Sequence, residues 1–374
     1  MRVLVCPDKF AGTLTAPQAA AAIAAGWRAV RADDDIVLRP VADGGPGFLD
    51  VLAAALPAAV AVPVTVPGPL GDPVAATVLL DAGTAYVEAA QACGLALLEP
   101  GRRDPTITTT YGVGALVAAG VEAGAHRVVI GLGGSATNDG GAGMLAALGA
   151  APVDLAGIVL PYGGSALLSC TGLTGPPRLR GATLIGASDV DSPMIGPRGA
   201  SAVFGPQKGA SPAQVSLLDS ALSRWAAVLE SLPTCPPGVA SRPGAGAAGG
   251  LGAAILATGG TLVSGFQTVR SVIGFDAALA GVDLVITGEG SFDDQSLRGK
   301  AVSGVAAAAR ERGLACVVLA GRVTAQPAAA AAAGITGAHS LVDHFDGDVA
   351  AALSRPAEGL SALAGRLARG LGRR

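Results

Sequence analysis

The sequence predicts an α/β protein in which both ends of the chain build one domain and the middle forms an inserted second domain. Near both ends, short Val/Ile/Leu-rich runs alternate with helical segments, which is the pattern of a parallel sheet covered on both faces. From about residue 60 the chain becomes rich in Pro and Gly, and clean alternation returns after a Gly-rich band at 241–255. A chain of 374 residues also exceeds the size at which a single hydrophobic core stops growing. We therefore expect one domain from residues 1–61 and 266–374, and an inserted α/β domain from residues 62–265.

A strand, a loop and a helix open the chain. The apolar run RVLVC (2–6) predicts the strand, and the polar, glycine-containing segment PDKFAGTL predicts the loop. The following TAPQAAAAIAAGWRAVR has the composition of a helix. Thr15 is suited to cap this helix, with Gln18 as its capping-box partner and Pro17 in the first turn.

The later strands are predicted by the same criteria. In the middle of the chain, AYVEAA (85–90) and HRVVIG (126–131) predict strands within turn-dense sequence. Near the carboxyl end, VDLVITGEG (282–290) predicts a strand that enters a glycine turn. AVSGVAAAARERG then predicts a helix, and LACVVLAG (314–321) predicts one more strand. This second cycle is the reason for assigning both ends to one sheet.

The composition argues against several classes of function. A net charge of −3 and an aromatic content of 3% offer neither a basic surface nor stacking rings for nucleic acid. The uncharged run at 51–71 contains four prolines that would break a membrane helix, and the amino terminus lacks the apolar segment of a signal peptide. Five cysteines are scattered without a C-x-x-C motif. Reduced thiols in a cytoplasmic protein, with no nucleic acid and no membrane as partners, are the expectation.

Five polar loops together suit phosphoryl transfer. Four of them are PDKFAGT (7–13), ADGGPG (42–47), GGSATNDGG (133–141) and TGEGSFDDQSLRGK (287–300); the fifth, 188–211, contains two aspartates and a Gln-Lys-Gly turn. Phosphoryl transfer needs cations on the phosphates, carboxylates for Mg²⁺ and a group that orients the attacking hydroxyl. Glycine-rich turns let backbone N–H groups approach phosphate oxygens. Each loop alone is more often an ordinary turn, so the inference depends on their occurrence together.

A nicotinamide cofactor is the rival interpretation of the loop that follows residue 130. Gly131, Gly133 and Ala136 match the dinucleotide pattern, and Asp154 lies near the spacing of its acidic partner. However, SATNDGG (135–141) puts two glycines where the first helical turns should be, and each glycine costs a helix about 1 kcal/mol. We therefore expect the helix to begin near Ala142. An NAD-dependent dehydrogenase stays open as a less favoured alternative.

Six motifs, in order along the chain, carry a resemblance to a known family. They are PDKFAGTLTA, ADGGPG, GLGGSATNDGGAGML, SDVDSPMIGPRGASAVFGPQKGA, GAAGGLGAA and VITGEGSFDDQSLRGK. Together they resemble the glycerate kinase family, of the two-domain α/β type found widely in bacteria. The resemblance implies a parallel, doubly wound, flavodoxin-like domain and a second, inserted α/β domain with a cleft between them. It also implies phosphorylation of D-glycerate by ATP, with 2-phosphoglycerate favoured over 3-phosphoglycerate as the product.

Roles follow for residues in the loops that match the family. Asp189 is the first choice for the base and Asp191 for Mg²⁺, although the two assignments could be exchanged. Lys208 and Lys9 would neutralise the phosphates or the glycerate carboxylate. Glycerate and ATP are the expected partners, and a homo-oligomer is left open. The remaining substrate- and phosphate-binding candidates are Asp43, Gly133, Gly134, Ser135, Asn138, Asp139, Glu289, Asp293 and Lys300.

Three departures from the family pattern bear on the acceptor. The family often has lysine where this chain has Ala11, glutamate where it has Pro46, and arginine where it has Ser291. Charges lost from loops of the site put the preferred substrate in doubt more than the type of reaction. They also keep open a protein that binds a hydroxy acid or a nucleotide without turnover, or one with a different acceptor.

Overall fold

The computed structural model describes residues 1–297 and 301–371, and the chain divides into two compact units. Unit 1 comprises Met1–Asp43, Asp50–Pro57 and Phe266–Arg374; unit 2 comprises Gly44–Leu49 and Ala58–Gly265. The short segment 44–49 therefore belongs with unit 2, whereas the sequence analysis grouped it with the ends of the chain. Within the described residues, no helix is both long enough and apolar enough to cross a membrane.

Unit 1 contains a five-stranded sheet in which all neighbouring strands run parallel. The order is β13-β12-β11-β1-β2, which in chain order within the unit is the flavodoxin-like arrangement 2-1-3-4-5. In such sheets ligands bind beyond the carboxyl ends of the strands where the order reverses, here between β1 and β11. The strands are β1 (Arg2–Val5), β2 (Asp35–Leu38), β11 (Leu284–Phe292), β12 (Ala315–Val323) and β13 (Gly337–Ser340).

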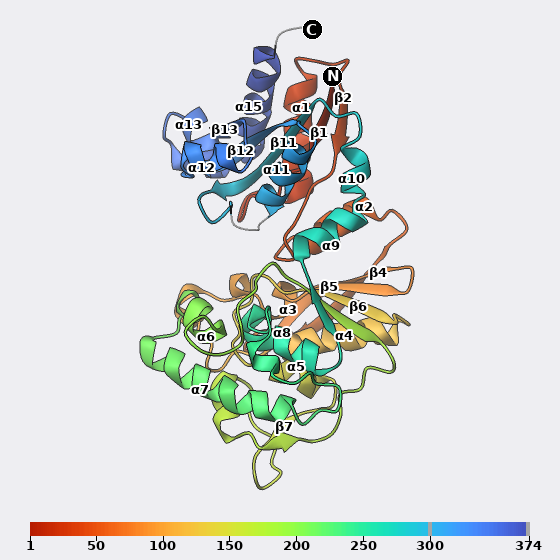
Figure 1. Cartoon of the computed structure of the whole chain (residues 1–374), viewed down its shortest axis with the longest axis vertical. Helices are drawn as coiled ribbons and strands as arrows, with labels where there is room; N and C mark the ends of the chain where they lie inside the picture. Colours follow the sequence, from red (N-terminus) through yellow and green to blue (C-terminus); the bar gives the residue numbers. More distant parts are fainter. Residues whose placement is uncertain (298–300, 372–374) are drawn as a thin grey trace. The chain divides into compact units, whose positions relative to one another are not determined.

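Helices α1 and α15 lie side by side against one face of this sheet (Figure 1). Gly26 permits their close approach, because a Cβ there would overlap the carbonyl oxygen of Ser361. Helix α11 packs on β11 and β12. The predicted capping box of α1 is confirmed: Thr15 Oγ1 accepts from Gln18 N at 3.3 Å, and Gln18 Oε1 accepts from Thr15 N at 2.9 Å. The helices are α1 (Ala16–Arg28), α2 (Phe48–Ala55), α9 (Gly265–Val272), α10 (Phe275–Ala278), α11 (Ala301–Glu311), α12 (Pro327–Ala332), α13 (Leu341–His344), α14 (Val349–Ser354) and α15 (Pro356–Gly370).

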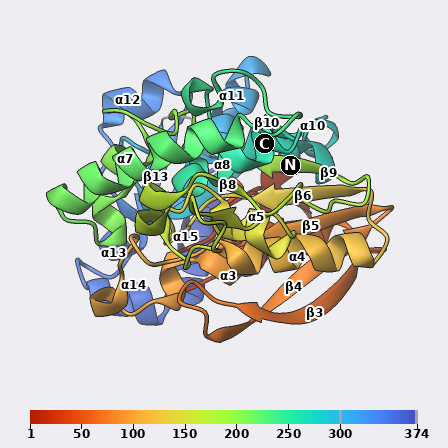
Figure 2. The same cartoon turned by 90° about the horizontal axis from the view of Figure 1, so that it is seen from below.

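Unit 2 contains a mixed six-stranded sheet in the order β10-β9-β6-β5-β4-β3. Its first four strands are parallel, and β4 and β3 complete it in antiparallel pairing. Helix α4 packs against β3, β4, β5 and β6 (Figure 2). Trp225 of α7 is fully buried in the hydrophobic core of this unit. The strands are β3 (Val60–Pro67), β4 (Pro73–Asp81), β5 (Thr84–Glu88), β6 (Arg127–Gly131), β9 (Thr183–Ala187) and β10 (Thr261–Val263), with a separate antiparallel pair β7 (Pro152–Val153) and β8 (Gly172–Leu173).

Several of the helices in unit 2 are short. The predicted strands at 85–90 and 126–131 correspond to β5 and β6. The α-helices are α3 (Ala90–Cys93), α4 (Tyr111–Glu122), α5 (Ala142–Ala147), α6 (Ala200–Phe204), α7 (Pro212–Leu229) and α8 (Ala247–Ala257). The 3₁₀ helices are η1 (Leu95–Leu97), η2 (Pro100–Arg102), η3 (Gly164–Ser169), η4 (Pro206–Lys208) and η5 (Val239–Ser241).

Candidate functional site

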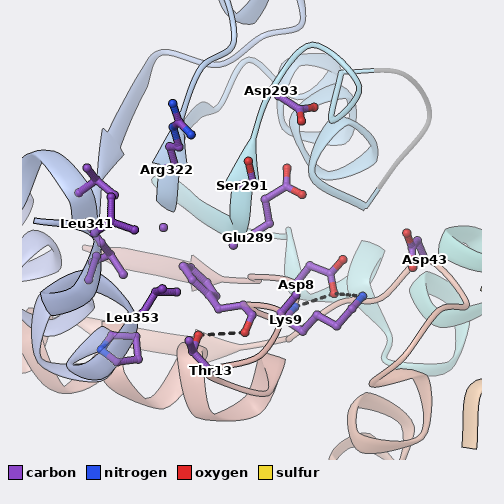
Figure 3. A pocket seen from close by; sticks show the side chains of 18 residues that line it. Asp8, Lys9, Thr13, Asp43, Glu289, Ser291, Asp293, Arg322, Leu341 and Leu353 are labelled. Carbon is purple, nitrogen blue, oxygen red and sulfur yellow. Dashed lines mark hydrogen bonds and ion pairs between the residues drawn. The ribbon is translucent and has the colours of Figure 1, made fainter. Parts of the chain in front are cut away.

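A cavity of about 450 Å³ lies at the carboxyl ends of β1, β11 and β12 in unit 1 (Figure 3). Its polar side is lined by the loop after β1, residues 8–13, and by residues 289–293 at the end of β11. Helices α13, α14 and α15 line the remainder. The cavity therefore occupies the place where the strand order of a flavodoxin-like sheet favours a ligand.

Asp8 is a carboxyl group of this cavity whose pKa is raised by burial. It is 8% exposed, and its Oδ1 accepts a hydrogen bond from Lys9 N at 2.6 Å and lies 3.8 Å from Lys9 Nζ. Burial is the main cause that raises the pKa of Asp8 to about 7; the carboxylates of Asp43 and Glu289 raise it further, and Lys9 lowers it. Oδ2 forms no hydrogen bond within the described part of the chain. Asp8 can therefore accept a proton near neutral pH.

The cavity also collects four residues that the sequence analysis selected. Lys9, Asp43, Glu289 and Asp293 all line it, although they come from three separate segments of the chain. Asp293 additionally organises a turn, because its Oδ1 accepts from Gln295 N at 2.8 Å and from Ser296 N at 3.1 Å. Lys300, the fifth candidate from the segments that form unit 1, lies outside the described residues.

Two residues of the cavity were missed by sequence reasoning. Asp8 stood in the selected PDKFAGT loop, and its position three residues after the end of a buried strand was the signal that could have singled it out. Arg322 carried no such signal, because it lies within a strand. It pairs in register with Ser291 on β11, and both side chains are exposed and line the cavity (Figure 3).

In unit 2, the glycine-rich loop between β6 and α5 packs against segment 44–49. Gly133 N donates to Gly44 O at 3.0 Å. Gly134 has a positive φ of 77°, and a Cβ there would come within 2.7 Å of the Pro46 ring. The backbone N–H groups of Gly134 and Ser135 donate no hydrogen bond within the residues that the structure describes. Such groups in a glycine-rich turn are suited to phosphate oxygens.

Lys208 is held against this loop from η4. Its ammonium group, with the residue only 3% exposed, donates to Ser135 Oγ at 3.0 Å and to Thr137 O at 2.6 Å. Burial lowers the pKa of Lys208 to about 8, opposed by the acidic groups of Cys93 and Asp139. The loop therefore carries a positive charge at neutral pH that is lost as the pH rises through about 8.

The next two residues of the loop hold its shape. Asp139 is buried, and its oxygens accept from Thr110 N and Oγ1 at 2.8 and 2.9 Å and from Gly141 N and Gly143 N at 3.2 Å. It thus satisfies the N-terminal N–H groups of α4 and α5. Burial nevertheless raises its pKa above the ordinary value. Asn138 donates to Ser201 Oγ at 2.9 Å, while its buried Oδ1 has no partner among the described residues.

Asp189 and Asp191 lie in the loop that follows β9. Both are exposed, and Asp189 Oδ1 accepts from Ser264 Oγ at 2.6 Å. Within the described residues, no group of three or more His, Cys, Asp or Glu side chains is arranged to hold a metal ion. Mg²⁺ commonly takes only one or two protein carboxylates together with phosphate oxygens and water. The donor set of this loop fits such a partial site.

The selected residues thus fall into two groups, one in each unit. Unit 1 brings together Lys9, Asp43, Glu289 and Asp293. Unit 2 carries the residues of the 133–139 loop with Lys208, which contacts it directly, and the two aspartates after β9.

The structure also bears on the dinucleotide pattern. Helix α5 begins at Ala142, so the expected late start of the helix is confirmed. Asp154 accepts from Ala156 N and Ile158 N, both at 2.9 Å, and so closes a local turn. The loop at 131–141 therefore differs from the short turn, followed at once by a helix, that binds a dinucleotide.

Comparison with known proteins gives one consistent family. The model of the Glycerate kinase family matches residues 3–372. The chain is 43% identical over 377 residues to an uncharacterized protein of Mycobacterium bovis, covering 100% of this chain and 92% of that protein. It is 41% identical over 332 residues to the glycerate 2-kinase of Escherichia coli K12, covering 87% and 86% of the two chains. A crystal structure from Salmonella typhimurium LT2, described as a glycerate kinase 2, superposes with a TM-score of 0.82 at 37% identity, covering 99% of this chain and 98% of that one.

Proposed function

The chain belongs to the glycerate kinase family, and we propose that it transfers the γ-phosphoryl group of ATP to D-glycerate, giving 2-phosphoglycerate and ADP. The observation that carries the proposal is the buried ammonium group of Lys208, held against Ser135 and Thr137 in a glycine-rich loop. A cation fixed beside N–H groups that have no partner in the described part of the chain is what phosphoryl transfer requires.

The phosphates of ATP would bind at the 133–139 loop. Gly133 and Gly134 let the backbone come close, Ser135 and Asn138 supply polar side chains, and Lys208 supplies charge. Asp139 would act indirectly, because its oxygens are occupied by N–H groups of α4 and α5. It would keep the loop in the shape that binds phosphate.

Mg²⁺ would be held by Asp191, or by Asp189 if the two residues exchange roles, because both are exposed carboxylates on one loop. When bound, the ion neutralises charge on the β- and γ-phosphates. Protein carboxylates would supply only part of its coordination, as is usual for this ion.

Two carboxylates compete for the role of base. Asp189, the choice from sequence, is exposed and accepts a hydrogen bond from Ser264. Asp8 is buried at the cavity of unit 1, and burial has raised its pKa to about 7, which suits a base at neutral pH. Either would orient the acceptor hydroxyl and receive its proton. Lys9, beside Asp8, would balance negative charge on the acceptor.

The test is a coupled assay of ADP release with D-glycerate, ATP and Mg²⁺, with the product resolved by phosphorus NMR. Phosphorus couples to the methine proton in 2-phosphoglycerate and to methylene protons in 3-phosphoglycerate, so one spectrum identifies the product. Lys208→Met should lower kcat by on the order of 10²–10³ because a preorganised cation is lost. Arg180→Ala, at an exposed ion pair with Glu122, is the matched control and should keep kcat.

Absence of ADP release with glycerate, in protein that still binds ATP, would refute the acceptor. Absence of both turnover and ATP binding would refute the kinase chemistry. Formation of 3-phosphoglycerate would retain the family and overturn the proposed regiochemistry.

A further inference from the structure

The unit 1 cavity is larger and more apolar than D-glycerate requires. Its volume of about 450 Å³ lies in the range of sites for drug-sized ligands, and a three-carbon acid fills only a small part of it. We call Leu341, Val349 and Leu353 the apolar wall; they line the cavity from α13 and α14 (Figure 3). Val349 is 53% exposed and Leu353 is 58% exposed, so both aliphatic side chains retain surface that a ligand can cover. This wall offers contact to an alkyl group that glycerate lacks.

Arg322 supplies a cation for a carboxylate in the same cavity. It lies on β12 opposite Ser291, and its side chain forms no hydrogen bond or ion pair with any other residue that the structure describes. A guanidinium group binds a carboxylate through two parallel hydrogen bonds. An exposed Arg322 therefore needs no internal ion pair to be broken before it binds an acid.

The charges of the cavity favour a hydroxy acid over a polyphosphate. In the described part of its lining, four carboxyl side chains stand against two cations, Lys9 and Arg322. An excess of carboxylates repels the phosphates of a nucleotide but accepts hydrogen bonds from hydroxyl groups. Asp8 contributes an oxygen, Oδ2, that has no hydrogen bond within the described residues. Hydroxyl groups together with a single carboxylate match this lining.

We propose that the unit 1 cavity binds the phosphoryl acceptor, and that the acceptors include, besides glycerate itself, 2,3-dihydroxy acids that carry an alkyl chain on C3. Arg322 binds the carboxylate, Asp8 accepts a hydrogen bond from the attacking hydroxyl, and the apolar wall contacts the alkyl chain. This inference rests on the proposed function, because it takes ATP as the phosphoryl donor. The hydroxyl oxygen bonds to the γ-phosphorus, the bond to the β,γ-bridging oxygen breaks, ADP leaves with that electron pair, and the hydroxyl proton passes to Asp8.

The first measurement compares kcat/KM for D-glycerate, 2,3-dihydroxybutanoate and 2,3-dihydroxyhexanoate, with ATP and Mg²⁺ held constant. Each methylene group that the wall covers should raise kcat/KM by about fourfold, the equivalent of burying one CH₂. Calorimetric titration of the same acids into the protein without ATP should give the same order of affinities. A binding readout without ATP separates the acceptor site from the transfer reaction.

Two variants then locate the site. Arg322→Ala should raise KM for every acid by on the order of 100-fold, with KM for ATP retained; Arg28→Ala, an exposed arginine outside the cavity, is the control. Leu353→Asp should cut kcat/KM for the hexanoate far more than for glycerate. Leu155→Asp, at a position in unit 2 that is 91% exposed, should leave the ratio of the two acids as it is.

The outcomes separate the two proposals. Binding of the longer acids that needs Arg322, without turnover, would support the acceptor pocket and refute the proposed function. If glycerate is turned over but the longer acids bind more weakly, the inference is wrong and the proposed kinase activity is retained. The same conclusion follows if the variants at Arg322 and Leu353 change only KM for ATP. If no acid binds or reacts, both fail.

Discussion

Asp8 shows how the fold changes the chemistry of a single side chain. An ordinary aspartate is ionised at neutral pH, whereas burial beside Asp43 and Glu289 raises the pKa of Asp8 to about 7. Between about pH 4 and 7 the folded protein therefore holds a proton that the unfolded chain has released. The contribution of Asp8 to stability is largest below pH 4 and is lost as the pH rises through about 7. A buried carboxylate at a cavity is thus a cost in stability that catalysis can use.

Replacing Asp8 by asparagine should separate these two effects. Asp8→Asn should be more stable than the parent at pH 8, by on the order of 1 kcal/mol or more, because no ionised group is buried. If Asp8 is the base, kcat/KM should fall by on the order of 10²–10⁴, and the loss of activity of the parent below about pH 7 should disappear from the residual rate. Urea unfolding at pH 4, 6 and 8 and a pH–rate profile measure both quantities.

Asp189→Asn is the comparison for the base. The carboxylate of Asp189 is exposed and accepts a hydrogen bond from Ser264 Oγ. A large loss of kcat in Asp189→Asn, with Asp8→Asn nearly as active as the parent, would identify Asp189 as the base. A stability difference between parent and Asp8→Asn that does not change with pH would contradict the burial argument.

At the scale of elements, helix α8 holds the glycine-rich loop of residues 133–141 in place. Its first turn contains three residues with positive φ, Ala248, Gly249 and Gly250, so the helix is kinked there. Gly249 lies against the loop: its carbonyl accepts from Gly140 N at 2.9 Å, and a Cβ on Gly249 would overlap Thr137 O. Thr137 O is also an acceptor for Lys208. The kink and the cation are therefore coupled through one backbone carbonyl.

Adjacent substitutions in this kink should have opposite effects. Gly249→Ala should lower the free energy of unfolding by about 2 kcal/mol or more and raise KM for ATP, because the new Cβ displaces the loop. Ala248→Gly should be neutral or stabilising by up to about 1 kcal/mol, since Ala248 already has a φ of 51°. Chemical denaturation and ATP kinetics provide the measurements. An unchanged KM for ATP in a folded Gly249→Ala protein would show that α8 does not control the loop.

At the scale of the whole molecule, the two units carry different chemistry. Unit 1 has a cavity with an excess of carboxylates, and unit 2 has a glycine-rich loop with a buried ammonium group. Acidic groups suit the hydroxyls of an acceptor, whereas N–H groups and a cation suit phosphate. We therefore expect the acceptor and the phosphates of the donor to contact different units.

Hydrogen–deuterium exchange of the full-length protein tests this division. A non-hydrolysable ATP analogue with Mg²⁺ should slow exchange in residues 133–141, because their backbone N–H groups would donate hydrogen bonds to the phosphates. A 2,3-dihydroxy acid alone should slow exchange in residues 7–13 and 289–293. Protection of a single unit by both ligands would contradict the division of roles. Added sodium chloride at matched ionic strength is the control for salt effects.

Parts of the candidate site could be predicted from the sequence where residue type and local context were sufficient to place a residue in it. The glycine-rich loop, its late helix start at Ala142 and Lys208 are cases in which local chemistry was enough. Arg322 could not be predicted in this way, because its relevance comes from lying opposite Ser291 on a neighbouring strand. Asp139 was selected for contact with substrate, but its oxygens serve the N-termini of two helices that its sequence position does not reveal.

By itself, the sequence determined the α/β class, the parallel strands at both ends of the chain, the capping box of α1 and the membership of a kinase family. These features depend on hydrophobic period, turn residues and short motifs, all of which are local in the chain. Only the tertiary structure decided that Asp8 is buried beside Asp43 and Glu289, that Arg322 joins the same cavity, and which residues form the apolar wall. Burial and proximity between distant segments set these properties. They arise from packing and strand order, which no single stretch of sequence encodes.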